Sequence, residues 1–286
     1  MKFYSPLRYP GGKNRLAKFL AQVCKKNDIN SHYVEPYAGG ASVALFLLLE
    51  GYVSKITIND IDRSIYAFWH SVLYDTDNLC KLIRETKIDI PNWRKQKEIQ
   101  KNKKHASLLE LGFSTFFLNR TNVSGILHSG GAIGGVKQNG PYKLDCRFNK
   151  VVLIERIKTI AQNKNNISLF NLDALELVKK IKKEKESSSS SIFYFDPPYY
   201  LKGESLYMNY YDNDDHEGVN NVIKKIKSVH WIVSYDDVPQ IRKMYSEFRK
   251  KRYTLLHSAY NTRIGKEVLF FSNGLKIPRI ANPIRA

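Results

Sequence analysis

The residues with the clearest chemical potential are Asp196, Pro197, Pro198 and Tyr199, which directly follow the apolar run at 192–195. An exocyclic amine on an aromatic ring is a poor nucleophile, because its lone pair is delocalised into the ring. Two acceptors aimed at its N–H bonds would favour tetrahedral geometry and stabilise the cation that forms when it attacks a methyl group. The Asp196 carboxylate and the Pro197 carbonyl can be these acceptors, since the two prolines fix the direction of the carbonyl.

Tyr199 can add a ring face on which a flipped base stacks. The alternative for this tetrapeptide is a rigid turn that closes a strand, with an aromatic side chain packed behind it. Its position favours methyl transfer to an amine, because doubly wound sheets bind ligands at the carboxyl ends of their strands.

A glycine turn provides a candidate cofactor site. Glu35 ends a short apolar segment and leads through Gly39 and Gly40 into an apolar helix, while Asp60 ends the next expected strand. Paired glycines let a backbone approach a cofactor closely, and an acid at this spacing suits ribose hydroxyls. The turn is not GxGxxG, so a zwitterionic nucleoside such as S-adenosylmethionine suits it better than a dinucleotide. The alternative is a simple glycine turn with a strand-end acid that caps a helix.

Two further elements fit the same ligand. Tyr9 to Lys13 (YPGGK) precede the first expected helix, and a loop with a cation suits a carboxylate such as that of a methionine moiety. Asp173 follows another expected strand and could accept a hydrogen bond from an adenine amine. A solvated lysine and a helix N-cap are the respective alternatives.

Strand and helix patterns alternate on both sides of a different central region. We expect strands at 32–35, 55–58, 167–172, 192–195, 231–234, 252–256 and 268–272, and helices at 15–24, 41–50 and 175–181. This alternation predicts an α/β, Rossmann-like sheet formed by residues 1–62 and 150–286. The region between them, residues 63–149, predicts an inserted, mainly helical module with hairpin strands around 125–128 and 141–144.

The inserted module carries the candidate nucleic-acid contacts. Arginine and asparagine side chains can bind guanine and adenine edges, and most basic side chains meet phosphates. A solvated loop is the alternative. The candidates are Asn119, Arg120, Thr121, Asn122, Lys137, Asn139, Lys143 and Arg147.

Composition supports a polyanionic partner. The chain has 46 Lys and Arg against 27 Asp and Glu, a formal charge of +19, although an AT-rich genome that favours lysine codons would have the same effect. The three cysteines and seven histidines are scattered, so we expect no metal site. No apolar run is long enough to cross a membrane, and we expect a cytoplasmic protein.

In chain order, the motifs PGGK, VEPYAGGASV, NDID, NRTNVSGI and FDPPY resemble those of the Dam-type (D12 class, alpha group) DNA adenine-N6 methyltransferases. The resemblance covers essentially the whole chain, and the ordered set is far more specific than any single motif. It implies a seven-stranded S-adenosylmethionine-dependent methyltransferase sheet with an inserted helical target-recognition domain and a DNA-contacting β-hairpin. It also implies cofactor contacts at Tyr9, Lys13, Asp60 and Asp196, and catalysis at 196–199.

Two departures limit what the resemblance implies. Tyr9 stands where the best-known members have Trp, and the segment 123–135 is richer in glycine than in the GATC-methylating members. No GATC target is therefore carried over. The sequence-based expectation is a bacterial or phage, nucleoid-associated enzyme that methylates adenine N6 in double-stranded DNA. We expect it to act as a monomer, with a cognate restriction endonuclease as a conceivable partner.

Two other functions compete with this one. A pocket built around Asp-Pro-Pro-Tyr could serve a planar amine in protein or RNA, and a non-catalytic nucleic-acid-binding protein could retain the same fold. The separate basic module favours DNA. Intact Lys13, Asp60 and Asp196 favour an enzyme, because a degenerate site would be expected to lose one of them.

Overall fold

The computed structural model describes residues 3–8, 13–183, 190–201, 211–227, 229–257 and 263–285. The chain divides into two compact units. Unit 1 comprises Met1–Phe3, Lys13–Asp60 and Asn166–Ala286, and unit 2 comprises Tyr4–Gly12 and Ile61–Asn165. Within the described ranges, no helix is both long and apolar enough to cross a membrane.

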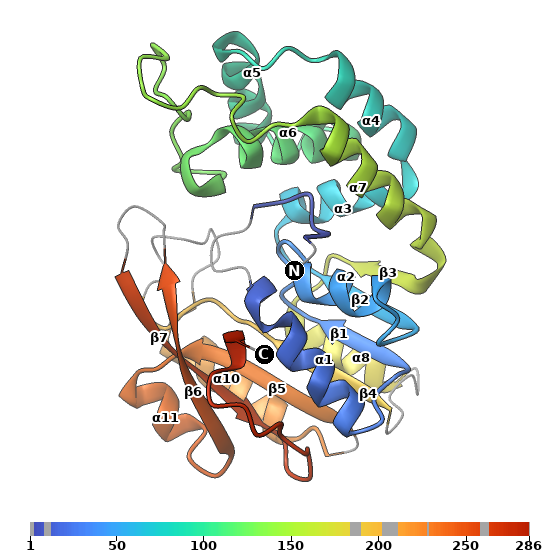
Figure 1. Cartoon of the computed structure of the whole chain (residues 1–286), viewed down its shortest axis with the longest axis vertical. Helices are drawn as coiled ribbons and strands as arrows, with labels where there is room; N and C mark the ends of the chain where they lie inside the picture. Colours follow the sequence, from blue (N-terminus) through green and yellow to red (C-terminus); the bar gives the residue numbers. More distant parts are fainter. Residues whose placement is uncertain are drawn as a thin grey trace. The chain divides into compact units, whose positions relative to one another are not determined.

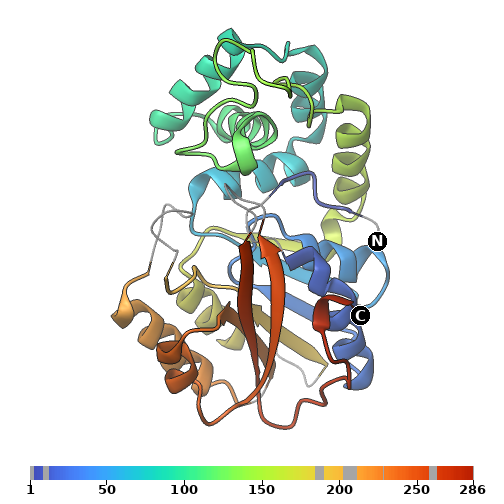
Figure 2. The same ribbon diagram turned by 60° about the vertical axis from the view of Figure 1, so that its left-hand side comes forward.

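Unit 1 is built on a seven-stranded sheet in the order β3-β2-β1-β4-β5-β7-β6 (Figure 1). Its first five strands are parallel, while β7 runs antiparallel to both β5 and β6, and this edge is seen best in Figure 2. The strands are β1 (His32–Glu35), β2 (Lys55–Asn59), β3 (Ile167–Phe170), β4 (Ser191–Phe195), β5 (His230–Asp236), β6 (Arg249–His257) and β7 (Arg263–Phe271). The predicted Rossmann-like, seven-stranded sheet is confirmed.

Helices cover both faces of this sheet, because alternate strand residues are apolar on both sides. Phe193 and Phe195 of β4 pack with α8, α10 and α11, whereas Phe19 of α1 meets Phe271 of β7 on the opposite face. The helical elements of unit 1 are η1 (Lys13–Leu16), α1 (Ala17–Lys26), α2 (Ser42–Leu49), α8 (Ala174–Lys183), α10 (Asn213–Lys224), α11 (Pro239–Met244) and η4 (Pro283–Arg285).

Unit 2 is helical in its described part. Its helix α6 packs against α3, α4 and α5, and Gly112 permits the close approach to α3, because a Cβ there would lie 2.5 Å from the Ala67 carbonyl oxygen. The elements are α3 (Arg63–Tyr74), α4 (Thr76–Glu85), α5 (Ile90–Lys101), α6 (Leu108–Thr121), η2 (Val123–Gly125) and α7 (Lys150–Gln162), and η3 (Lys164–Asn166) leads back into unit 1.

The boundaries of the two units differ from the predicted domains at three places, and at one of them only Ile61 and Asp62 change sides. Helix α7 belongs to unit 2, since it packs against α3 and α4, and so does the segment Tyr4–Gly12. Within that segment, the Pro6 carbonyl oxygen accepts a hydrogen bond from Arg120 of α6. The first residues of the chain therefore contribute to both units.

The predicted β-hairpin of the inserted module is wrong for this structure. Between 122 and 149 the described strand pairing is one isolated bridge, Asn122 with Ala132. Residues 125–128 and 141–144, where the two strands were expected, form the end of η2, bends, turns and irregular backbone. Between them, Gly134, Gly135 and Gln138 have φ values of +80°, +73° and +53°.

Candidate active site

The site lies in unit 1, at the point where the order of the parallel strands reverses. Strands β1 and β4 are neighbours in the sheet but are followed by connections that run to opposite sides. Loops diverge after the carboxyl ends of such strands and leave a crevice that suits a ligand. Glu35 ends β1 and Asp196 follows β4, so the sequence-predicted carboxylates meet at this edge.

Asp196 is held by two contacts. Its Oδ1 accepts a hydrogen bond from Ser234 Oγ at 2.6 Å and lies 3.2 Å from Lys13 Nζ. Burial raises the pKa of the Asp196 carboxyl, an effect that Lys13 and Ser234 oppose and that nearby Glu267 reinforces. The side chain retains 23% exposure, so an amine can still reach the carboxylate.

Lys13 joins Asp196 to a second buried carboxylate. Its Nζ lies 3.4 Å from Glu267 Oε2 and donates a hydrogen bond to the Tyr199 hydroxyl at 2.9 Å. Although burial alone would lower the pKa of Lys13, Asp196 and Glu267 raise it well above its usual value. The ammonium ion is therefore a counter-ion within this cluster, which differs from the predicted contact to a ligand carboxylate.

Tyr199 also differs from its predicted role. Only 3% of the residue is exposed, its hydroxyl donates to Glu267 Oε1, and Lys13 Nζ lies 4.8 Å from its ring centroid. The expected open face for a stacked base is therefore filled by the cluster itself. Tyr199 here braces the Asp-Pro-Pro turn from behind.

The exit from that turn is fixed by Asp236 at the end of β5. Its two carboxylate oxygens accept the backbone N–H groups of Tyr200, at 2.9 Å, and Leu201, at 3.1 Å. The segment is thus anchored on both sides, by Ser234 before the prolines and by Asp236 after them. This rigidity fixes the position of the Pro197 carbonyl.

The glycine turn is shaped by the ends of neighbouring strands. Gly39 has φ +46°, in the left-handed region, and its N–H donates to Asp60 Oδ2 at 2.9 Å. Asn59 Nδ2 donates to the carbonyl oxygens of Pro36 and Leu172, which ties together the loops after β1 and β3. Asp60 therefore lies against the turn, as its spacing predicts.

Glu35 lies beneath the turn rather than in the crevice. It is buried, and its Oε1 accepts hydrogen bonds from the Tyr33 hydroxyl at 3.0 Å and the Ala44 N–H at 3.1 Å. Burial raises the pKa of Glu35 to about 8. The carboxyl thus supports the start of α2 from inside.

Asp173 and Asp215 both cap helices. Asp173 Oδ1 accepts the Leu175 N–H at 2.8 Å at the start of α8. Asp215 forms a capping box with Asp212 at the start of α10. The predicted cofactor contact at Tyr9 lies outside the described residues.

In unit 2, the Asn-Arg-Thr-Asn segment is internal. Asn119 accepts the Arg8 N–H and donates to the Arg8 and Gly125 carbonyls, and Arg120 donates to the Pro6 carbonyl. Thr121 donates to its own helix, and Asn122 joins Trp93 to the Ile126 carbonyl. All four residues are buried, with exposed fractions of 1% for Asn119, 8% for Arg120 and 0% for Thr121 and Asn122. The prediction that these four side chains contact DNA is therefore wrong for this structure.

The other predicted contacts lie on the surface of unit 2. Gln138 organises their loop, since its amide donates to the Ile133 carbonyl at 2.8 Å and accepts the Leu144 N–H at 2.9 Å. Tyr142 is 63% exposed on the same loop. The exposed polar and basic side chains are those of Lys137, Asn139, Lys143 and Arg147.

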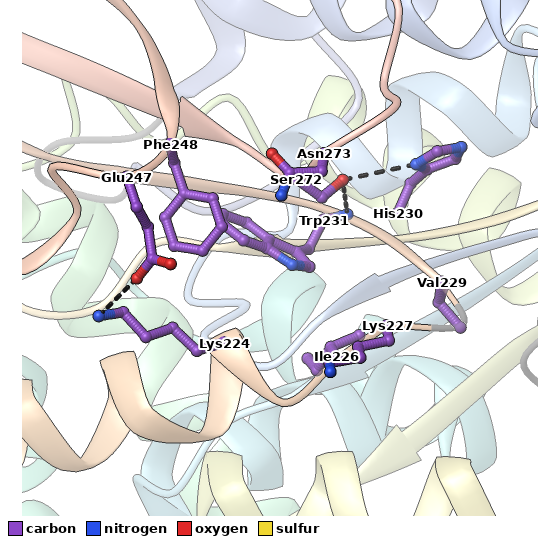
Figure 3. A pocket seen from close by; sticks show the side chains of 10 residues that line it. All are labelled: Lys224, Ile226, Lys227, Val229, His230, Trp231, Glu247, Phe248, Ser272 and Asn273. Atoms are coloured by element: carbon purple, nitrogen blue, oxygen red, sulfur yellow. Dashed lines mark hydrogen bonds and ion pairs between the residues drawn. The ribbon is translucent and has the colours of Figure 1, made fainter.

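A separate pocket of about 390 Å³ lies at the opposite edge of the sheet, where β5 begins (Figure 3). The side chains of Trp231 and Phe248 meet edge to face in its wall, and Lys224 pairs with Glu247 at 2.7 Å. Its lining contains none of the predicted site residues, so it is distinct from the site around Asp196.

Sequence reasoning missed Asn59, Ser234, Asp236 and Glu267. Ser234 interrupts the apolar run of WIVSY, which is a signal that a polar group is needed at that point, whereas Glu267 directly precedes the apolar run VLFF. Their partners are distant in sequence, so their roles became visible only in the folded sheet. Within the described ranges, no group of three or more His, Cys, Asp or Glu residues is arranged to hold a metal ion.

Comparison with known proteins shows the family of the chain. A family model of the D12 class N6 adenine-specific DNA methyltransferases matches residues 9–259. The type II methyltransferase M.MjaIII of Methanocaldococcus jannaschii is 24% identical over 230 residues, 73% of this chain and 75% of that protein. A SAM-dependent methyltransferase structure from Agrobacterium tumefaciens is 10% identical, with a TM-score of 0.40, and the match covers 89% of this chain and 59% of that one. A putative RNA methyltransferase from Pyrococcus horikoshii is 11% identical, with a TM-score of 0.42, over 91% and 84%.

Proposed function

The chain belongs to the D12 class of N6 adenine-specific DNA methyltransferases, and on that premise we propose that Asp196 and the Pro197 carbonyl activate the adenine amine. The enzyme transfers a methyl group from S-adenosylmethionine to adenine N6 in DNA. The observation that carries the assignment is the partly exposed Asp196 carboxylate, held at the reversal point of the sheet by Ser234 and Lys13.

In this proposal, Asp196 accepts one N6–H bond and the Pro197 carbonyl accepts the other. Both acceptors favour a tetrahedral amine, and the carboxylate stabilises the positive charge that develops on nitrogen. Because Ser234 and Asp236 fix the turn on both sides, the acceptors need no reorganisation during the reaction. A base inside a duplex cannot reach them, so the adenine is flipped out of double-stranded DNA.

The chemistry of the glycine turn fits the cofactor. When bound, S-adenosylmethionine supplies a methyl group activated by its sulfonium centre. In this proposal Asp60, which accepts the Gly39 N–H, also accepts ribose hydroxyls, and Asp173, whose Oδ1 caps α8, accepts an adenine amine. Glu35 acts indirectly, since it supports the turn from below.

The exposed loop of unit 2 is proposed to bind DNA. Lys137, Lys143 and Arg147 are exposed cations on a loop that Gln138 holds together, and Asn139 adds an amide. Such side chains gain affinity by releasing condensed counterions from phosphates. We place the duplex-binding surface of unit 2 on this loop.

M.MjaIII is named a type II methyltransferase. By analogy we propose that this enzyme protects a specific DNA sequence alongside a cognate restriction endonuclease. It would act as a monomer on the cytoplasmic nucleoid, because one chain holds both the proposed catalytic carboxylate and the basic loop.

The substitution Asp196→Ala tests the catalytic assignment. Single-turnover transfer of a labelled methyl group to adenine-containing duplexes should fall by about 10²- to 10³-fold, the usual cost of removing one preorganised polar contact to the transition state. Affinities for S-adenosylmethionine and DNA should stay within about threefold, since Lys13 and Glu267 still neutralise each other. Transfer at near wild-type rate would refute the assignment.

The basic loop is tested by replacing Lys137, Lys143 and Arg147 together with glutamine. If each of the three cations contacts a phosphate, the slope of log K against log salt concentration should become shallower by about 2.7. A smaller change in slope would mean that fewer of the three side chains contact phosphates. Replacing three exposed lysines of unit 1, Lys18, Lys179 and Lys225, lowers the net charge equally and should change the slope less. Equal slopes for the two triple variants would contradict this assignment.

A further inference from the structure

Glu267 is a buried carboxylate at the edge of the sheet where Asp196 lies. It is 1% exposed and stands in register with Asp236 of β5 and Tyr253 of β6. Because β7 is antiparallel, this early part of β7 lies beside the carboxyl end of β5. The strand therefore brings a second acid to the same edge as Asp196.

The contacts of Glu267 lead back to the Asp-Pro-Pro-Tyr turn. Its Oε1 accepts the hydroxyl of Tyr199, and its Oε2 accepts the hydroxyl of Tyr253. The same Oε2 lies 3.4 Å from Lys13 Nζ, which is also 3.2 Å from Asp196 Oδ1. One ammonium ion is thus shared between two carboxylates.

The cluster brings a second acidic side chain close to Asp196. The formal charges of Lys13, Asp196 and Glu267 sum to −1, because Lys13 is one cation between two acids. Each oxygen of Glu267 accepts one tyrosine hydroxyl, whereas a glutamine at this position would offer one acceptor oxygen. Negative charge behind Asp196 would stabilise a cation that forms at the Asp196 carboxylate.

We propose that Glu267 is a positioning residue for methyl transfer, which keeps the cluster negatively charged and holds Lys13 and Tyr199 behind Asp196. This role rests on the proposed function of Asp196. As the N6 lone pair forms the new N–C bond, the S–C bond breaks and its electron pair stays on sulfur, so positive charge passes to nitrogen. That nitrogen then releases one proton by way of Asp196 to solvent, which leaves a neutral methylated amine and restores the −1 cluster.

Glu267→Gln keeps the size and one acceptor but removes the charge. We expect kcat to fall by about 10- to 100-fold, while KM for S-adenosylmethionine changes less than about threefold, because the contacts of Glu267 described above lead to Lys13, Tyr199 and Tyr253. Its control is Glu247→Gln, which removes an exposed carboxylate at the opposite edge and should leave both constants unchanged.

The pH dependence separates a charge effect from loosened packing. The titratable groups that act on Asp196 are Lys13, Glu35, Tyr194 and Glu267. Negative Glu267 raises the pKa of Asp196, so its removal should move the acid limb of the kcat profile to lower pH. Glu267→Asp keeps the charge with a shorter side chain, and it should lower kcat without moving the acid limb.

Each outcome decides the proposal. A Glu267→Gln enzyme with wild-type kcat, or one whose acid limb matches that of Glu267→Asp, would overturn it. If Glu267→Gln does not fold, Glu267→Asp decides alone. A kcat profile whose acid limb moves to lower pH in Glu267→Asp would overturn the proposal. A lower kcat with the acid limb in its wild-type position would support the proposal. The proposed function fails separately: in that case Asp196→Ala retains transfer, whatever Glu267 variants do.

Discussion

Replacing Lys13 with methionine removes the cation that lies between the Asp196 and Glu267 carboxylates and keeps a long, flexible side chain. Lys13 Nζ lies 3.2 Å from Asp196 and 3.4 Å from Glu267, so the carboxylate oxygens are separated by at most about 6.6 Å, the sum of these distances. At an effective dielectric constant of about 20, their repulsion is about 2.5 kcal/mol. Breaking a buried ion pair on one side typically costs about 3–5 kcal/mol.

The cost should depend on pH. Burial raises the pKa of the Asp196 carboxyl, and the loss of Lys13, which opposes this effect, raises it further above its unfolded value. A raised carboxyl pKa gives stability that is present at low pH and lost as pH rises through the folded-state value. The free energy of unfolding of Lys13→Met, measured in urea, should therefore lie about 3–5 kcal/mol below wild type at pH 8, with a smaller deficit at pH 5.

A double-mutant cycle checks the cause. Adding Glu267→Gln to Lys13→Met removes the repulsion and should restore about 2 kcal/mol at pH 8, whereas adding the distant Glu247→Gln should restore nothing. The proposed role of Lys13 as a counter-ion shared by Asp196 and Glu267 would be refuted by either of two results. One is a loss of unfolding free energy that is the same at pH 5 and pH 8, and the other is a double-mutant cycle with no coupling energy between Lys13 and Glu267.

Three further outcomes follow from single contacts. Because the pKa of Glu35 is raised to about 8, wild-type stability should fall by about 1.4 kcal/mol per pH unit between pH 5 and 8 through this group, and urea unfolding of Glu35→Gln should lack that component. Asn119→Ala should lower unfolding free energy by about 1–3 kcal/mol, because it breaks buried hydrogen bonds to Arg8, yet leave the salt slope of DNA binding unchanged. Asp60→Ala should weaken S-adenosylmethionine binding, measured by calorimetry, by at least about tenfold, because the Asp60 carboxylate holds the Gly39 turn. The affinity for DNA should not change. An unchanged affinity for S-adenosylmethionine would show that Asp60 is not part of the cofactor site.

The framework of unit 1 was predictable because its signals are local. The apolar run before Asp196 forms β4 at Ser191–Phe195, and the strand predicted at 32–35 is observed as His32–Glu35. Parallel strands must end at a common edge, so the meeting of Glu35 and Asp196 follows from the alternation of strand and helix. The glycine turn and Asp60 were predictable for the same reason.

The inserted region was harder to predict because polarity does not reveal exposure. From the sequence, Asn119 and Asn122 were expected to be surface residues. In the structure Asn119 donates to the carbonyl oxygen of Arg8, which is distant in sequence, and Asn122 donates to that of Ile126 in an irregular segment. The glycines near 134 suit a hairpin turn and a series of loops equally well. Glu267 reached the site only through a register between two antiparallel strands, which no local pattern encodes.

The central claim is most directly tested by the chemical identity of the product. Duplex DNA should be incubated with the enzyme and isotopically labelled S-adenosylmethionine, digested to nucleosides and separated by mass spectrometry. The account predicts label in N6-methyldeoxyadenosine, lost in Asp196→Ala and retained in Glu247→Gln. Label in a methylated cytosine, in RNA or in protein, with none in N6-methyldeoxyadenosine, would contradict it.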